Sequence, residues 1–219
     1  MTAPHIIAVD GPAASGKGTL AKKLAAHFDY AYLDTGALYR AVALSVLRAG
    51  AAPEDQAAAV TAAETLDMQI LQEADFAAAL RTAETGMAAS IVAAMPSVRQ
   101  AILEAQRQFA AKPPQGKAGA VLDGRDIGTV VCPDATAKLF ITAAAQTRAE
   151  RRHKELLAQD PNSQLADVLA DIEARDARDK GRATAPLKAA ADAHLLDTTD
   201  LSIEEAFAAA LALVSTPKA

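Results

Sequence analysis

The sequence predicts an α/β protein in which a five-stranded parallel sheet carries helices on both faces. Short apolar runs with the length of buried strands occur at Ile6–Asp10, Ala31–Asp34, Ala120–Asp123, Lys138–Thr142 and His194–Asp197. Segments rich in alanine and leucine separate these runs and have helical spacing. Because strands that alternate with helices form parallel sheets, this order of elements predicts the architecture.

The first strand leads directly into a glycine-rich turn, and a helix is expected to follow from Lys17 to Phe28. The turn reads Gly11-Pro12-Ala13-Ala14-Ser15-Gly16-Lys17-Gly18-Thr19. In a strand–turn–helix unit of this kind, backbone N–H groups and the positive end of the helix dipole converge on one point, which favours an anion. The ammonium of Lys17 can then reach the β- and γ-phosphates of a nucleoside triphosphate. The sequence therefore predicts a phosphate-binding loop.

The residue after the lysine departs from the common pattern. A Ser or Thr hydroxyl usually stands there and meets Mg²⁺, whereas this chain has Gly18 followed by Thr19. A glycine allows a second ligand or a backbone segment to approach closely. Thr19 and Asp123 are both possible metal ligands, and the sequence leaves the choice open.

The other expected helices follow the strands in order. They are Leu38–Ala49, Val98–Ala110, Gln146–Gln159, Leu165–Arg175 and Ile203–Val214. Ser202 and Glu205 have the spacing of a capping box at the start of the last helix.

Four of the five expected strands end in aspartate: Asp10, Asp34, Asp123 and Asp197. In open α/β sheets the ligand crevice lies beyond the carboxyl ends of the strands. We therefore expect several of these carboxylates near the phosphates or their metal, and others only capping the turn that follows.

Composition describes an ordinary globular chain of 219 residues, with 51% hydrophobic and 22% charged residues. The formal net charge of −5 argues against a general nucleic-acid surface. Cys132 is the only cysteine, so an intrachain disulfide is excluded and a reducing compartment is expected. The first residues lack the pattern of a signal peptide, and no run is long enough for a membrane span. These features predict a cytoplasmic protein without membrane or nucleic-acid partners.

Two segments interrupt the alternation of strands and helices. The first extends from about Pro53 to Pro96, with Thr85-Gly86 as the expected break between helices. The second extends from Asp160 to Pro186 and ends in a dense cluster of charges. Both segments are consistent with solvated surface helices, and equally with mobile flaps that cover the crevice.

Arginines accompany glycines or carboxylates in three further segments. These are Asp34-Thr35-Gly36-Ala37-Leu38-Tyr39-Arg40, Asp123-Gly124-Arg125-Asp126-Ile127-Gly128-Thr129 and Arg175-Asp176-Ala177-Arg178-Asp179-Lys180-Gly181-Arg182. Any one of these arginines is equally consistent with a surface ion pair. Together they suit a phosphate acceptor, since guanidinium groups grip phosphate and relieve its repulsion from the triphosphate. A phosphate acceptor is already largely dianionic at neutral pH and needs no general base.

In this order along the chain, the loop and the three arginine segments resemble bacterial cytidylate kinases, from Ile6 to the last helix. The resemblance implies a P-loop NTPase fold and direct in-line transfer of the γ-phosphoryl group of ATP to CMP or dCMP with Mg²⁺, as part of pyrimidine nucleotide metabolism. It also implies one kinase domain over residues 1–219, with a core at 1–52, 97–145 and 187–219. A monophosphate-binding insert would then occupy about 53–96, and a lid about 146–186. A monomer is expected.

The resemblance also implies roles for individual residues. The catalytic residues would be Lys17, Arg125 and Arg182. ATP would contact Gly11, Pro12, Ala13, Ala14, Ser15, Gly16, Lys17, Gly18, Thr19, Arg148 and Arg152. CMP would contact Thr35, Arg40, Ser90, Arg99, Arg125, Asp126, Arg175, Asp179 and Arg182. Asp126 would accept a hydrogen bond from the exocyclic amino group of cytosine, which uracil lacks. The metal would be held mainly by the ATP phosphates and water.

One departure and two rival functions stay open. Between Asp67 and Ser90 the chain is shorter than many members of that family, which carry a longer β-rich insert there. A different P-loop kinase, for shikimate or another nucleoside monophosphate, would share the loop but use another acceptor. A nucleotide-dependent switch would bind the triphosphate without a monophosphate site.

Overall fold

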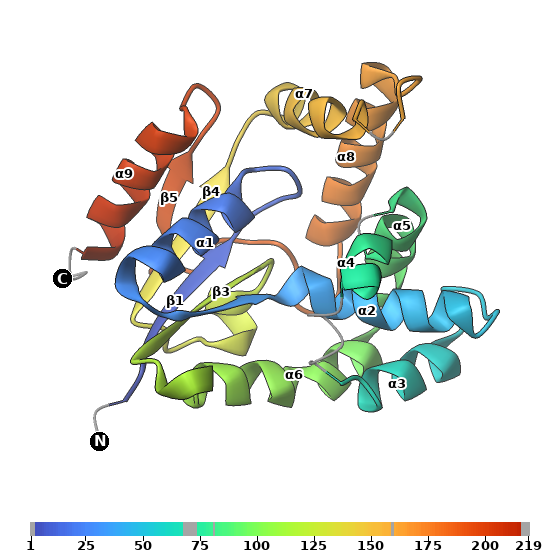
Figure 1. Cartoon of the computed structure of the whole chain (residues 1–219), viewed down its shortest axis with the longest axis horizontal. Helices are drawn as coiled ribbons and strands as arrows, with labels where there is room; N and C mark the ends of the chain where they lie inside the picture. The colour runs from blue at the N-terminus through green and yellow to red at the C-terminus, as the bar shows by residue number, and fades with distance from the viewer. Residues whose placement is uncertain (1–2, 68–73, 81, 159, 216–219) are drawn as a thin grey trace. The chain divides into compact units, whose positions relative to one another are not determined.

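The computed structural model describes residues 3–67, 74–80, 82–158 and 160–215 (Figure 1). The chain divides into two compact units. The first, here called the sheet unit, comprises Met1–Leu33 and Phe109–Ala219, and the second, the helical unit, comprises Asp34–Gln108. The division into core, insert and lid stays a prediction beside these two units.

Five strands form the sheet in the order β2-β3-β1-β4-β5. Their bounds are β1 His5–Asp10, β2 Ala31–Asp34, β3 Gly119–Gly124, β4 Ala137–Thr142 and β5 His194–Asp197. The central strand β1 runs parallel to β3 and β4, and its last residue, Asp10, lies opposite Gly124 and Phe140. This register aligns the carboxyl ends of the strands, so the loop after β1 and the turn after β3 begin side by side.

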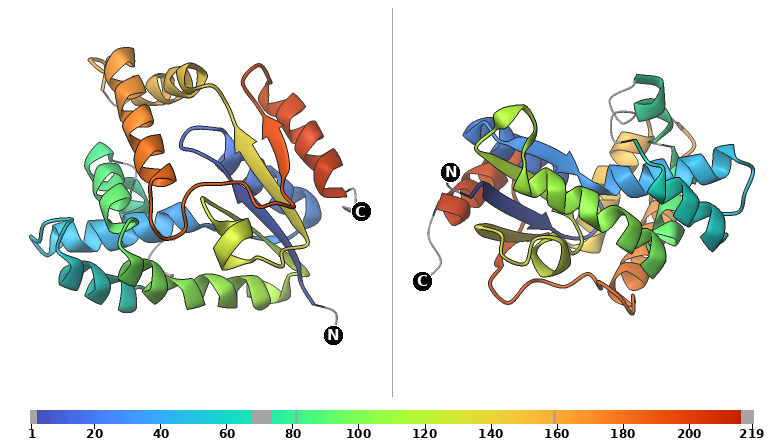
Figure 2. Two further views of the ribbon diagram at one scale, coloured as in Figure 1. Left: turned by 180° about the vertical axis from the view of Figure 1, so that it is seen from behind. Right: turned by 90° about the horizontal axis from the view of Figure 1, so that it is seen from below.

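Helices α1 (Lys17–Phe28) and α9 (Ile203–Ser215) cover one face of the sheet (Figure 1). Their apolar side chains share one core with the strands, as Leu20 and Leu24 of α1 do with Val9 of β1. A short π-helix, Ile127–Val131, lies on the other face (Figure 2). The predicted fold class, a parallel five-stranded P-loop sheet between helices, is confirmed.

Two helices between β4 and β5, α7 (Ala145–Leu156) and α8 (Leu165–Lys180), pack against each other through Ala149, Val168 and Ile172. The expected end of α7 at Gln159 lies outside the described residues. Helix α8 runs five residues beyond its expected end at Arg175, and Gly181 caps it. The sequence left this segment open between a solvated surface helix and a mobile flap, and in the structure Asp176 and Asp179 of its last turns are buried.

Helices make up the regular structure described in the helical unit. They are α2 Thr35–Arg48, α3 Gln56–Glu64, α4 Ala74–Ala79, α5 Ala83–Val92 and α6 Pro96–Ala111. Ala41 and Leu44 of α2 form a small core with Phe76 and Leu80. Over the described part of 53–96 no strand pair stands in place of the β-rich insert.

The expected break at Thr85-Gly86 is wrong, because both residues lie inside α5. The helix starts instead at Ala83, and the hydroxyl of its N-cap residue, Thr82, accepts a hydrogen bond from the Thr85 N–H at 3.2 Å. A glycine inside a helix costs only about 1 kcal/mol, which capping and packing can outweigh.

The capping box expected at the start of α9 is confirmed. The N–H of Glu205 donates to the Ser202 hydroxyl at 3.2 Å, and the Ser202 N–H donates to the Glu205 carboxylate at 2.9 Å. The hydrogen bonds that the N–H and the hydroxyl of Ser202 donate to this carboxylate lower the pKa of Glu205. Within the described ranges no single helix is long and apolar enough to cross a membrane. Two helical segments joined by a bend, Ala83–Val92 and Pro96–Gly116, pass that test together, by length and composition only.

Candidate active site

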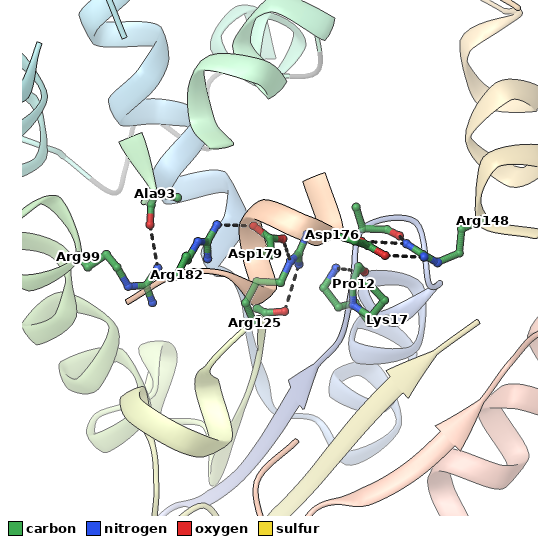
Figure 3. Close-up of polar contacts among 11 residues, drawn as sticks. Pro12, Lys17, Ala93, Arg99, Arg125, Arg148, Asp176, Asp179 and Arg182 are labelled. Carbon is green, nitrogen blue, oxygen red and sulfur yellow. Dashed lines mark hydrogen bonds and ion pairs between the residues drawn. The ribbon is translucent and has the colours of Figure 1, made fainter. Parts of the chain in front are cut away.

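The loop between β1 and α1 leaves the start of α1 open to an anion. Gly16 caps the helix in the left-handed region, with φ 82°, and no side chain caps the N–H groups of the first turn. That turn also carries no acidic residue. The ammonium of Lys17 lies 3.4 Å from the carbonyl oxygen of Pro12 (Figure 3). N–H groups without a side-chain cap, the helix dipole and this ammonium are together suited to phosphate oxygens.

Gly11 is required where the loop leaves the sheet. A Cβ at this position would lie 2.0 Å from the carbonyl oxygen of Ile141, and the glycine has φ 156°. The loop can therefore pass over β4 only if residue 11 has no side chain.

Substituting Gly11→Ala is expected to lower the free energy of unfolding by about 3 kcal/mol, because backbone atoms must move to admit the methyl group. Chemical denaturation monitored by circular dichroism measures this loss. The matched control is Gly86→Ala, where a Cβ would meet nothing within 4 Å and a helical alanine should raise stability slightly. Equal stability of Gly11→Ala and the parent chain would contradict the account of this loop.

The glycine after Lys17 makes room for a carboxylate. A Cβ on Gly18 would lie 3.0 Å from Oδ2 of Asp123, and the same oxygen accepts a hydrogen bond from the Tyr32 hydroxyl at 2.9 Å. We expected a second ligand or a backbone segment to approach here, and the close neighbour is a side chain. Thr19 is exposed on the first turn of α1.

A metal site would draw on few protein atoms. The described residues contain no group of three or more His, Cys, Asp or Glu side chains placed to hold an ion. Mg²⁺ commonly takes one or two carboxylates and fills its other positions with phosphate oxygens and water. The single carboxylate of Asp123, beside Gly18 at the start of α1, fits that mode of binding.

Arg148 of α7 connects the phosphate-binding loop to α8. Its guanidinium donates to the carbonyl oxygen of Ala13 at 3.1 Å and pairs with both carboxylate oxygens of Asp176, at 3.1 and 2.6 Å (Figure 3). Both side chains are largely buried. Arg148 therefore lies at the phosphate-binding loop, and its contact with ATP stays a prediction.

The two neighbouring arginines on α7 have different environments. Arg151 donates to the carbonyl oxygen of Thr198 at 2.6 Å, and the Thr198 hydroxyl donates to the carbonyl oxygen of Ser15 at 3.1 Å. Arg152 forms an exposed ion pair with Glu155 at 3.0 Å. Arg151 therefore supports the loop from behind, and the ATP contact of Arg152 stays a prediction.

A second arginine cluster gathers around Asp179 on α8. Arg125 pairs with Oδ2 of Asp179 at 2.8 Å, and Arg182 pairs with Oδ1 at 2.5 Å (Figure 3). The Asp179 side chain is 1% exposed. Burial would raise the pKa of Asp179, but the charges of Arg125, Arg182 and Arg175 and the hydrogen bond from Arg125 together lower it. The cluster thus holds two guanidinium groups around one buried carboxylate.

The sheet unit holds two further residues that were expected to contact the acceptor nucleotide, Asp126 in the turn after β3 and Arg175 on α8. Asp126 is buried and follows Arg125 directly. Behind the turn, the N–H groups of Ile127 and Gly128 donate to the two carboxylate oxygens of Asp10, each at 2.8 Å. Burial raises the pKa of Asp10 to about 7, against the opposing effect of these N–H groups. Arg175 lies one helical turn before Asp179 and helps to lower the pKa of that residue.

Two of the four aspartates at strand ends accept hydrogen bonds from the residues that follow them, which is the capping role that we expected for some of the four. Asp34 accepts the Ala37 N–H at 3.0 Å at the start of α2, and Asp197 accepts both the N–H and the hydroxyl of Thr199, at 2.8 and 2.5 Å. The hydrogen bonds from Thr199 lower the pKa of Asp197.

The helical unit holds the other four residues that were expected to contact the acceptor nucleotide. Arg40 pairs with Asp34 at 2.6 Å, and Gly36 leaves space for that pair. Thr35 is buried at the first position of α2, and Ser90 is buried in α5. The Arg99 guanidinium donates to the carbonyl oxygen of Ala93 at 3.3 Å and lies 5.3 Å from the ring centroid of Tyr39.

Sequence reasoning did not assign roles to Asp176, Tyr32 or Thr198. A signal for Asp176 was available, because Asp176 and Asp179 are three residues apart and thus share one helix face. Tyr32 and Asp123 are 91 residues apart, and their contact depends on tertiary structure alone.

Comparison with known proteins identifies the family. A family model described as cytidylate kinase matches residues 7–216. A protein of Azorhizobium caulinodans named cytidylate kinase is 59% identical, over 95% of this chain and 97% of its own length. One of Rhodospirillum rubrum with the same name is 54% identical, over 96% and 97%. An uncharacterized protein from Eubacterium ventriosum shares the fold, with a TM-score of 0.53 and 13% identity over 97% of this chain and 99% of that one. Since the family model spans nearly the whole chain and these relatives are more than half identical to it, the chain belongs to the cytidylate kinase family.

Proposed function

We propose that ATP binds with its phosphates over Gly11–Thr19, and that the arginine cluster around Asp179 holds the phosphate of the acceptor nucleotide. As a member of the cytidylate kinase family, the chain is a kinase that transfers the γ-phosphoryl group of ATP to CMP or dCMP and releases ADP with CDP or dCDP. The observation that carries the site assignment is the pairing of both Arg125 and Arg182 with one buried carboxylate.

Charge is the main obstacle to this reaction, because two phosphorylated substrates repel each other. The ammonium of Lys17 and the N–H groups at the start of α1 would hold the donor phosphates. Arg125 and Arg182 would neutralise and align the acceptor phosphate for in-line transfer. In this proposal Asp179 keeps both guanidinium groups in place until that phosphate arrives.

Binding of the nucleoside would involve the neighbouring side chains. Asp126 would accept a hydrogen bond from the cytosine amino group, and Arg175 and Asp179 would contact the sugar. The acceptor roles of Thr35, Arg40, Ser90 and Arg99 stay predictions from the resemblance, as does the ATP contact of Arg152.

Mg²⁺ is part of the proposal. Bound to the ATP phosphates, the ion would neutralise charge on the transferring group, and Asp123 or Thr19 would supply the protein oxygen. We also propose a monomer that acts in the cytoplasm on small-molecule substrates, without nucleic-acid or membrane partners. The formal net charge of −5 supports the absence of a nucleic-acid surface.

An acceptor panel tests the proposal. ADP production from Mg-ATP is measured with CMP, dCMP, UMP, AMP, GMP, shikimate or no acceptor. We expect rapid turnover mainly with CMP and dCMP. Faster turnover with another acceptor would assign the chain to a different phosphoryl transfer, and turnover that no acceptor increases would favour the nucleotide-dependent switch.

The Asp126→Asn variant is expected to reduce the preference for CMP over UMP about tenfold, which is the effect of one hydrogen bond to a charged group. The asparagine amide can donate to the uracil carbonyl, whereas the carboxylate cannot. The ratio of kcat/KM for the two nucleotides measures the change. Asp134→Asn makes the same substitution at an exposed position and should leave the ratio unchanged. An unaltered preference in Asp126→Asn would remove Asp126 from the base-reading role.

A further inference from the structure

Asp10 is the last residue of β1, immediately before Gly11. Its carboxylate accepts hydrogen bonds from the turn after the neighbouring strand, β3. The residue is 4% exposed. Its Oδ1 accepts the N–H of Ile127 and its Oδ2 the N–H of Gly128, both at 2.8 Å. Each carboxylate oxygen thus holds one of two successive backbone N–H groups, directly after Arg125 and Asp126.

We propose that Asp10 is a positioning residue for the acceptor nucleotide, whose carboxylate fixes the turn at 124–128 and so sets the directions of Arg125 and Asp126. The inference rests on the proposed function, because it assumes that these two side chains meet CMP. Asp10 itself would touch neither substrate.

The geometry requires a carboxylate at this position. Two N–H donors point at the two oxygens, so an acceptor-only group is needed, whereas an amide offers one oxygen and places its NH₂ against the second donor. The parallel register sets Asp10 opposite Gly124, which brings the turn within reach. Gly128 completes the fit, because a Cβ there would lie 3.1 Å from Cδ of Lys138 and 3.5 Å from Oδ2 of Asp10.

Charged groups approach Asp10 from two elements besides β1. Asp126 and Arg125 act on it from the turn, in opposite directions. Lys138 of β4 packs its stem against Gly128, while its ammonium pairs with Asp192 at 2.7 Å. Burial is the main influence and raises the pKa of Asp10 to about 7. As the pH falls through this range, the carboxylate becomes a neutral, weaker acceptor, so the turn should loosen.

The first test compares CMP with UMP between about pH 5.5 and about pH 8.5. CMP and UMP carry the same phosphate group, so the effect of its titration cancels in the ratio of their kcat/KM values. In the parent chain we expect the ratio to fall about tenfold on acidification, with a midpoint near the pKa of Asp10. In Asp10→Asn the ratio should be low at every pH. Asp55→Asn, at the exposed N-cap of α3 where asparagine caps equally well, should follow the parent chain.

A second measurement does not depend on activity or on the variant's folding. The amide proton resonances of Ile127 and Gly128 in the parent chain should shift together with pH, with the same midpoint as the substrate ratio. A flat ratio in the parent chain, an Asp10→Asn ratio equal to the parent's, or amide resonances that do not titrate would each overturn the inference. Absence of CMP-dependent turnover in the parent chain would instead refute the proposed function, and the amide titration would still show whether Asp10 fixes the turn.

Discussion

Replacing Lys17 with methionine is expected to lower kcat about a thousandfold, the upper range for loss of one preorganised electrostatic contact to a transition state. Methionine keeps most of the aliphatic stem but removes the ammonium. The backbone N–H groups at the start of α1 remain, so ATP should still bind, more weakly than to the parent chain. A coupled assay of ADP formation at saturating CMP measures kcat, and calorimetric titration with ATP measures binding.

The matched control for Lys17→Met is Lys23→Met on the same helix. Lys23 forms a partly exposed pair with Glu204 at 3.5 Å, and such pairs contribute little to stability. Its kcat should equal that of the parent chain. If Lys17→Met kept kcat within about twofold of the parent chain, the loop would not be the donor site.

The second large effect is expected for Arg125→Met, which should lower kcat/KM for CMP at least about a hundredfold while leaving the KM for ATP nearly unchanged. The variant loses a phosphate-binding guanidinium and leaves Asp179 paired with Arg182 alone. Arg125→Lys should recover only part of the activity, because an ammonium keeps the charge but not the planar fork. Steady-state kinetics with each substrate varied in turn separate the two effects.

Arg107→Met, at an exposed position of α6, removes the same charge from a residue with no proposed role and should behave like the parent chain. A double-mutant cycle between Arg125→Met and Asp179→Asn then isolates the coupling between the two side chains. A rise in the KM for ATP in Arg125→Met with an unchanged KM for CMP would contradict an acceptor-side role.

Much of the fold followed from local signals in the sequence. The bounds of α1, β2 and β5 match their expected residues. Each has a sharp chemical boundary, such as the aspartates that end β2 and β5. The prediction was wrong at Thr85-Gly86, where the capping hydroxyl of Thr82 and tertiary packing outweigh the glycine signal.

The residue types and positions of the candidate site could be predicted from the sequence, but most of the contacts between its residues could not. The phosphate-binding loop and the arginines around Asp179 could be named from residue type and position. The sequence did not predict the hydrogen bond between Tyr32 and Asp123, nor those that Asp10 accepts from the turn after β3. Each of these bonds joins residues at least 91 positions apart. Such contacts depend on strand order and register, which local patterns do not specify.

The most direct test of the central claim is the stoichiometry of transfer. Purified chain is mixed with Mg-ATP and CMP, and ADP and CDP are quantified together by mass spectrometry, with Lys17→Met as the blank. We predict one CDP formed for each ADP throughout the reaction. ADP formed without CDP would show hydrolysis in place of transfer and would contradict the account.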